Sequence, residues 1–194
     1  MSVTLPGSSC SRQARVIPEP MPGTAPRAKA WLVVEQYGPY GRKALLESEL
    51  PTSVGAHLTT AKKGSGTSVL LARPTGSHAT PEGEYRRRVW LAHTTAHAAQ
   101  MRKARIIDPH VLTEIDLRRL AGGTMPDLGS PTAEPVLFVC TNGRRDACCA
   151  LLGRKALEGV EDANVWECSH LGGHRFAATA VLLPWGYVYR HVTP

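Results

Sequence analysis

Short apolar runs alternate with polar, helix-compatible stretches along the first half of the chain. The run AWLVVEQ predicts a buried strand, because apolar side chains fill nearly every position. A turn-forming YGPYGR follows, and KALLESEL has the spacing of a helix. Bounded by polar turns, TSVLLAR and YRRRVWLAHT predict two more strands. The predicted strands cover 30–36, 67–73 and 85–94; the predicted helical segments cover 43–50, 52–63 and 113–120.

The second half begins with PVLFVC, an apolar strand that ends at Cys140. The polar loop TNGRRD leads into a helix over 147–160, and NVWEC then predicts a strand that is followed by the loop SHLGGH. Two short strands are expected around TAVLLP and YVYRHV. Strand, helix, strand and two strands is the order of a thioredoxin-like unit, and the first half begins in the same way. We therefore expect an α/β protein with two α/β units.

Pro and Gly mark the expected domain boundaries. The first 29 residues contain five prolines and little periodicity, so we expect a loosely ordered leader over 1–29. The segment AGGTMPDLGSPTAEP (121–135) reads as a linker. It divides an N-terminal α/β unit over 30–120 from a C-terminal unit over 136–194.

Composition narrows the class of protein. Hydrophobic residues make up 42% and charged residues 20% of the 194 residues, as in globular proteins. The chain has no run of 18 apolar residues, and its N-terminus lacks the apolar core of a secretory signal. We therefore expect a cytoplasmic protein without a membrane partner. Residues 1–97 hold 12 Lys/Arg against 6 Asp/Glu, but no nucleic-acid-binding module is visible, so a solvated basic surface is favoured over a nucleic-acid partner.

Four of the five cysteines fall within 29 residues. In a chain without a secretory signal, this clustering favours metal or redox chemistry over a disulfide framework. Cys140 ends a strand at the carboxyl edge of the sheet, and Cys149 follows near a helix N-terminus, which stabilises a thiolate. His170 and His174 flank two glycines that allow tight bending. Two thiolates and two imidazoles at one sheet edge form a soft-donor site for zinc or an iron–sulfur cluster.

Spacing favours one of these metals without excluding the other. Structural zinc sites separate paired cysteines by two to four residues, whereas eight residues separate Cys140 from Cys149. A wide loop suits a 2Fe-2S cluster held by two Cys and two His. A third possibility is a thiol redox protein that uses Cys140 with Cys148 or Cys149. It lacks the Cys-x-x-Cys spacing and leaves the paired histidines unexplained.

The motifs CTNGRRDACCALLGRKAL and VWECSHLGGHRFAATAVLLPWG closely resemble those of the sucrase/ferredoxin-like family, also called thioredoxin-like ferredoxins. The earlier WLVVEQYGPYGRKALLES resembles the family's N-terminal signature, so the resemblance runs from about Trp31 onward. It implies a thioredoxin-like domain that holds a 2Fe-2S cluster. The ligands that it implies, matched by motif, are Cys140, Cys149, His170 and His174.

The resemblance also selects between two neighbouring cysteines. Cys148 and Cys149 point about 100° apart on a helix, so only one can face the cluster loop, and the family pattern selects Cys149. The implied function is electron transfer with a redox partner protein. Glycoside hydrolysis would need two carboxylates across a scissile bond, and nothing in the chain argues for it. An electron carrier is therefore favoured over an enzyme.

The chain departs from the family pattern at two places. Asn142 stands where relatives commonly have His, which is expected to change hydrogen bonding near the cluster without removing a ligand. The chain ends at Pro194, whereas many bacterial relatives continue.

Several residues near the expected ligands have supporting roles. Arg144 and Arg145 either offset the negative charge of the site or form a solvated loop. Asp146 is expected to cap the helix that begins at Ala147. Cys148 is expected to pack in that helix, and Cys168 is read as a buried structural thiol beside the site. His93 and His97 repeat the four-residue spacing, but without further ligands they are expected to be structural or exposed.

Overall fold

The computed structural model describes residues 10–17, 23–76, 85–95 and 97–194. The α/β class is confirmed. None of the helices in these ranges is long and apolar enough to cross a membrane. In chain order the elements are α1 Cys10–Val16, β1 Ala30–Glu35, α2 Thr52–Ala61, β2 Thr67–Pro74, β3 Arg87–His93, β4 Gln100–Ile106, the 3₁₀ helix η1 Pro109–Glu114, α3 Leu117–Ala121, β5 Ser130–Pro131, β6 Val136–Cys140, α4 Ala147–Ala156, β7 Val165–Cys168, the 3₁₀ helix η2 His174–Phe176, β8 Ala180–Leu183 and β9 Tyr187–Tyr189.

All strands in the described part of the chain belong to one sheet, in the order β5-β4-β3-β1-β2-β7-β6-β8-β9. In the first half, β1 pairs with β2 in parallel and with β3 antiparallel, and β3 pairs with β4 antiparallel. The second half repeats this scheme: β6 is parallel to β7 and antiparallel to β8, which pairs with β9. The two halves meet where β2 runs antiparallel to β7. Each half thus contains a strand, a helix and three further strands. The second half follows the predicted order, whereas β4 of the first half, with the largely polar sequence QMRKARI, was not predicted.

The linker expected over 121–135 is attached to the first half. Its short strand β5 pairs with β4, and its Met125 and Leu128 pack against the core beneath α2 and α3. Because one sheet runs through both halves, the arrangement does not test whether either half folds alone. The domain boundary and the thioredoxin-like fold of each half stay predictions. Residues 1–9 and 18–22 of the expected leader lie outside the described residues.

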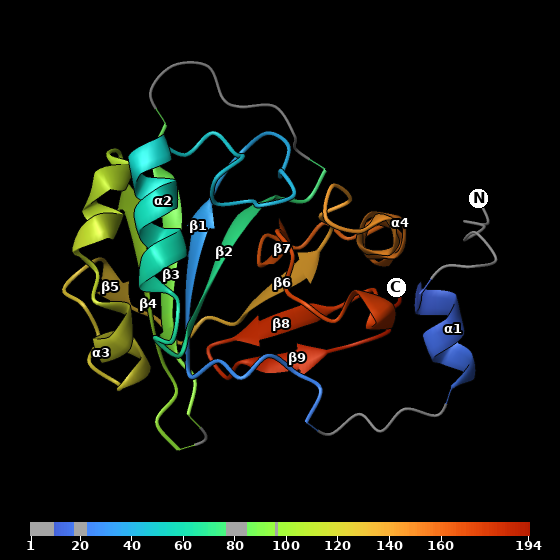
Figure 1. Cartoon of the computed structure of the whole chain (residues 1–194). Coiled ribbons are helices and arrows are strands. Elements are labelled where there is room, and N and C mark those ends of the chain that lie inside the picture. Colours follow the sequence, from blue (N-terminus) through green and yellow to red (C-terminus); the bar gives the residue numbers. More distant parts are fainter. Residues whose placement is uncertain (1–9, 18–22, 77–84, 96) are drawn as a thin grey trace.

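Hydrophobic side chains pack against both faces of the sheet. Side chains alternate between the faces of a strand, so β1 sends Leu32 and Val34 to one face and Trp31 and Val33 to the other. The first face packs beneath α2, η1 and α3, to the left in Figure 1. The second face meets the strands of the C-terminal half, which run across those of the first half (Figure 1). Burial on both faces explains why β1 is apolar almost throughout.

Aromatic side chains join the two halves across the second face. The ring of Trp90 on β3 lies 5.1 Å from the Phe138 ring and 4.8 Å from the Trp166 ring, in edge-to-face contacts. All three side chains are buried. Edge-to-face pairs add about 0.5–1.5 kcal/mol beyond burial of area. The C-terminal half is therefore packed against the first half as well as hydrogen-bonded to it.

A buried ion pair lies where β2 meets β7. Arg73 and Glu167 are opposite each other in the register, and the Nη2 of Arg73 lies 2.7 Å from Oε2 of Glu167. Both side chains are only 4% exposed. Arg73 also donates to the carbonyl of Gly38, and Thr141 donates its hydroxyl to Glu167. The guanidinium stacks over the ring of Tyr40. The pair thus connects the loops that follow β1 and β6 to the central strands.

The helix predicted over 43–50 is wrong. Residues 42–46 form turns and 47–50 form bends. The carboxylate of Glu47 accepts a hydrogen bond from the backbone N–H of Arg42. The carbonyl of Leu45 lies so close to Gly55 of α2 that a Cβ at Gly55 would overlap it. One helical turn does form, since the N–H groups of Leu46 and Glu47 donate to the carbonyl of Lys43, but the chain then bends away and packs against α2.

The helix predicted over 113–120 is divided. The 3₁₀ helix η1 ends at Glu114, Ile115 is extended, and α3 begins after Asp116. The carboxylate of Asp116 accepts hydrogen bonds from the N–H groups of Arg118 and Arg119, so it is an N-cap that starts a new helix. Residues 77–84, between β2 and β3, lie outside the described residues.

We expect the Arg73→Met variant to lose about 3–5 kcal/mol of unfolding free energy, because it leaves the Glu167 carboxylate buried without its partner. Urea unfolding followed by circular dichroism measures this loss. The matched control is Lys103→Met, which breaks the half-exposed Lys103–Glu134 pair and is expected to cost less than about 1 kcal/mol. Equal losses in the two variants would contradict a structural role for the buried pair.

Candidate metal centre

Cys140 is the last residue of β6, at the carboxyl edge of the sheet as expected. Its side chain is fully buried. Its sulfur lies 3.8 Å from Nδ1 of His170. The backbone N–H groups of Asn142 and Leu171 also donate to it, as does the Cys149 thiol. The sulfur is therefore held in a pocket of hydrogen-bond donors, which suits a thiolate.

Cys149 lies in the first turn of α4, and two contacts fix its place. Asp146 is the N-cap of α4 and accepts a hydrogen bond from the N–H of Cys148, which confirms the predicted cap. One turn further, Gly153 packs directly on the end of β6, where a Cβ would overlap the carbonyl oxygen of Cys140. The cap and this close approach bring the Cys149 sulfur to 3.7 Å from Nδ1 of His170.

The loop after β7 carries both histidines. Gly172 and Gly173 have φ values of +103° and +63°, in the region that favours glycine. The two glycines turn the chain back on itself between His170 and His174. The ring centroids of His170 and His174 are 6.1 Å apart, and the two rings are tilted by 35°. The predicted bend of this loop is confirmed.

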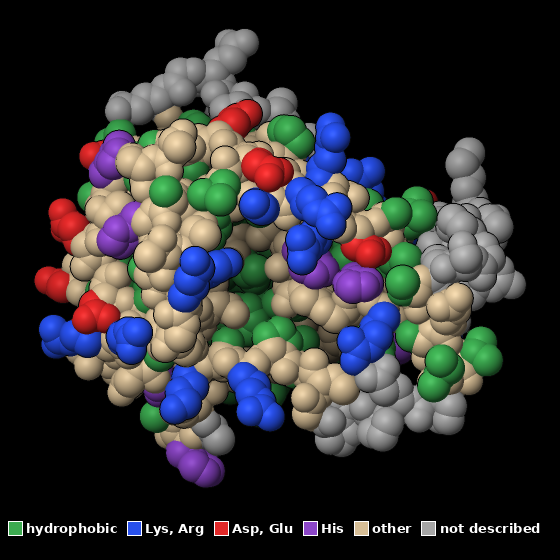
Figure 2. Space-filling model, in the orientation of Figure 1, with side chains coloured by type: hydrophobic (Ala, Val, Ile, Leu, Met, Phe, Trp, Pro, Cys, Tyr) green, Lys and Arg blue, Asp and Glu red, His purple; other side chains and the backbone are tan. Residues whose placement is uncertain are grey.

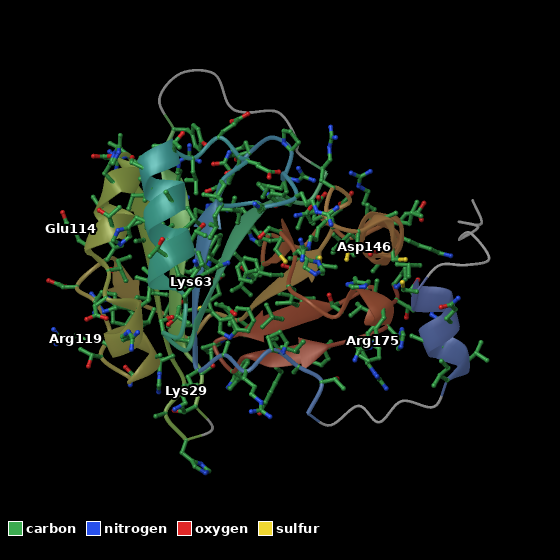
Figure 3. All side chains as sticks on the ribbon, viewed as in Figure 1. Lys29, Lys63, Glu114, Arg119, Asp146 and Arg175 are labelled. Carbon is green, nitrogen blue, oxygen red and sulfur yellow. The ribbon has the colours of Figure 1, made fainter. Side chains whose placement is uncertain are left out.

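Cys140, Cys149 and His170 form the one group of potential metal donors found among the described residues, with donor atoms all within 4.8 Å of one another. Two thiols and an imidazole are soft donors that suit zinc or iron. Figure 3 shows sulfur atoms gathered near Asp146, between the end of β6 and α4. The geometry therefore fits a metal ion or cluster at this edge.

His174 stands outside this group. Its Nε2 lies 3.9 Å from Oδ2 of Asp146, and its side chain is 46% exposed. The four residues expected as ligands are therefore arranged from the protein interior to its surface, with Cys140 deepest and His174 outermost. Whether His174 completes the ligand set stays a prediction.

The pKa values of the Cys140 and Cys149 thiols are shifted in opposite directions. The hydrogen bond donated by Cys149 lowers the pKa of Cys140 well below its usual range, and the bonds from His170 and two backbone N–H groups act in the same direction. Donating that hydrogen bond raises the pKa of Cys149, and burial raises it further.

The other cysteines have different surroundings. Cys148 is buried but lies outside the donor group, on the neighbouring position of α4. Cys168 pairs with Cys140 in the β6–β7 register and is fully buried, and burial raises the pKa of its thiol. Of the two adjacent cysteines, it is thus Cys149 that faces Cys140 and His170. Arg144 and Arg145 are exposed in the loop between β6 and α4.

The side-chain amide of Asn142 holds the loop between β6 and α4 in place. Its side chain is buried, donates to the carbonyl of Gly41 and accepts from the N–H of Arg145. The sequence singled out Asn142 only as a departure from a pattern. It missed Glu167 and Thr141, whose hydrogen bond lies just behind Cys140. Glu167 could have been noticed in the sequence, because it is a charged residue inside the otherwise apolar strand NVWEC.

The histidine pair His93 and His97 does not form a second site. His93 is buried, and its ring nitrogens lie 3.2 Å from the Leu120 carbonyl and 2.8 Å from the Thr95 hydroxyl. His97 is exposed. The prediction that these histidines are structural or exposed is confirmed.

Comparison with known proteins identifies the family. The model of the sucrase/ferredoxin-like family matches residues 21–194, which is most of the chain. The chain belongs to the sucrase/ferredoxin-like family. The match includes the whole donor group and both glycines of the histidine loop. No match was found among the curated proteins or among the solved structures.

We expect Gly153→Ala to destabilise the protein and to weaken metal binding. Alanine in a helix is favoured over glycine by about 1 kcal/mol, but here the added Cβ would push α4 away from Cys140. Thermal unfolding and the metal content of the purified variant measure the two effects. A higher unfolding temperature with unchanged metal content would contradict the close approach of α4 to β6.

Proposed function

We propose that this protein is a one-electron carrier whose 2Fe-2S cluster is ligated by Cys140, Cys149, His170 and His174. The observation that carries the proposal is the convergence of two buried cysteines and a histidine at one sheet edge, with a second histidine 6.1 Å from the first. Membership of the sucrase/ferredoxin-like family supports it. A cluster with two irons needs more room than a single ion, and the offset of His174 toward the surface is consistent with that need.

The residues around the site suit electron transfer. A bound cluster would supply the one-electron chemistry. The backbone N–H groups of Asn142 and Leu171 donate to the Cys140 sulfur, and such hydrogen bonds tune the reduction potential. Cys140 and Cys149 are buried, so the cysteine side excludes water, whereas His174 is half exposed. Electrons would therefore pass through the histidine side.

Asp146 is proposed to orient His174. One carboxylate oxygen caps α4, and the other lies 3.9 Å from Nε2 of His174. Carboxylates that face the second nitrogen of a metal-binding histidine fix its ring orientation. Asp146 would thus position Cys149 through the helix and His174 through its charge.

The exposed histidine also suggests how the protein is used. A carrier needs a donor and an acceptor, and a half-exposed ligand gives a partner protein direct access to the site. We therefore propose a protein redox partner that docks over His174. A cytoplasmic location is proposed with it, as expected from the sequence.

A thiol redox function is the second candidate. It is supported by the hydrogen bond between Cys149 and Cys140 and by the lowered pKa of Cys140, which favours a reactive thiolate. The two thiols would lose two electrons and two protons to a disulfide acceptor and form one disulfide bond. This function gives no role to His174. A structural zinc ion bound by the same donors is the third candidate.

We expect anaerobically purified protein to be coloured and to contain about two irons and two sulfides per chain. The Cys149→Ser variant should lose the cluster, because its oxygen replaces a thiolate in the donor group. Cys148→Ser is the matched control and should retain the cluster, because Cys148 lies outside that group. Optical spectra with iron and sulfide analysis measure both.

Three results would contradict this assignment. Loss of colour in the Cys148 variant with retention in the Cys149 variant would reverse the choice of ligand. Colourless protein with stoichiometric zinc would establish the structural metal site instead. Colourless, metal-free protein with a reducible Cys140–Cys149 disulfide would favour the thiol redox function.

We expect the reduction potential to fall as pH rises. A ligating imidazole can lose the proton on its other nitrogen, and an oxidised cluster favours that loss, so reduction is coupled to proton uptake. The slope should approach about 59 mV per pH unit for one proton and one electron. Protein-film voltammetry from about pH 6 to about pH 9 measures it.

The His174→Cys variant is the matched comparison. A thiolate in place of an imidazole should lower the potential and reduce the pH dependence. A potential that is independent of pH in the unchanged protein would contradict ligation by an exposed imidazole.

A further inference from the structure

A hollow lies beside His170, between α2 and the C-terminal half. It has a volume of about 270 Å³, which is near the lower end of small-molecule sites. Figure 2 shows it as a depression with a hydrophobic floor, with Lys and Arg side chains around it and His on one side. Both halves of the protein contribute to its wall, so it exists only because β2 and β7 are paired.

The charged side chains that line the hollow are positively charged. Four cationic side chains line it: Arg42, Lys43, Lys62 and Arg145. They come from the loop after β1, the end of α2 and the loop before α4. No Asp or Glu is among the described residues that line it. The nearby carboxylate of Glu47 accepts a hydrogen bond from the backbone N–H of Arg42.

These cations have no acidic partner within the described part of the chain. The ion pairs found there involve other residues. Lys62 is partly desolvated by its neighbours, and this burial lowers the pKa of its amine. All four cationic side chains are exposed, and their convergence without a counter-charge gives the hollow a positive potential that an anion would offset. Four cationic side chains around one recess thus favour an anionic ligand.

The floor and wall add two more features. Leu45, Leu46 and Val69 supply an apolar floor, and Leu46 is still 42% exposed. Hydroxyl groups of Thr59 and Ser169 line the wall. A ligand that fits would combine clustered negative charge with an apolar part.

We propose that this hollow binds a small organic anion that carries at least two negative charges, as in a phosphate ester or a polycarboxylate. A bound anion would contact the ring of His170, which also lines the hollow, and would lie beside the metal centre. A small ligand is favoured over an acidic protein surface because the cations and hydroxyls converge in a recess of about 270 Å³. The inference does not depend on which metal the site holds.

Pyrophosphate, citrate, phenyl phosphate and inorganic phosphate are suitable probes. We expect saturable binding of pyrophosphate or citrate to the protein as purified, measured by isothermal titration calorimetry at constant ionic strength. Comparing these two probes distinguishes phosphate from carboxylate chemistry. Phenyl phosphate should bind more tightly than inorganic phosphate, and Leu46→Ala should reduce this preference, because the floor receives the ring.

Variants of neighbouring residues test the location. Lys62→Gln and Arg145→Gln should each weaken binding of the tighter polyanion by about tenfold, as expected for loss of a charged hydrogen bond. Lys63→Gln is the matched control, because Lys63 is the next residue and does not line the hollow. It should change the affinity by less than about twofold.

Three outcomes would overturn the proposal. One is the absence of saturable binding of all four probes at millimolar concentration. Another is an equal loss of affinity in the Lys62 and Lys63 variants, which would indicate a non-specific charged surface. The third is binding of poly-glutamate alone, which would identify the hollow as part of a docking surface for an acidic protein.

Discussion

The antiparallel contact between β2 and β7 is the constraint on which the rest of the structure depends. It places Ala72 opposite Cys168 and Arg73 opposite Glu167. The C-terminal ends of β2 and β7 therefore lie side by side. Buried charges are costly unless they are paired and hydrogen-bonded. The Arg73–Glu167 pair meets that requirement only in this register, and Thr141 and the carbonyl of Gly38 complete it. The contact thus brings the loops of both halves to one place.

The candidate metal centre is built on that edge from three separate segments. Cys140 is placed by β6, Cys149 by the cap and close packing of α4, and His170 by the loop after β7. The donors are already close, with the cysteines buried and His174 near the solvent. The donor group is thus buried on the cysteine side and reaches the solvent on the histidine side.

The two halves share a topology but differ in the chemistry at the equivalent edge. The N–H of Thr141 bonds the carbonyl of Cys168, and the N–H of Gln36 bonds the carbonyl of Ala72. Glu35 therefore holds in β1 the place that Cys140 holds in β6. Its carboxylate accepts from the N–H of Arg88, and nearby Gln36 accepts from Arg87. A closed polar network thus occupies in the first half the position that sulfur donors occupy in the second.

The sequence by itself determined most of the strands, the order of elements in the second half and the residues capable of metal chemistry. It missed β4, in which three of the seven residues are Lys or Arg. Apolar runs such as PVLFVC are buried on both faces, so they can be recognised as strands from the sequence alone. The residue spacing wrongly predicted a helix over 43–50, because the packing of this segment against Gly55 of α2 outweighs its local helical preference. Helical geometry alone left Cys148 and Cys149 open; the family resemblance selected Cys149, and the tertiary structure places it with Cys140 and His170. Only the tertiary structure decided that α2 lies across the hollow from that histidine. Such choices depend on contacts between segments that are distant in the chain, and no local pattern records them.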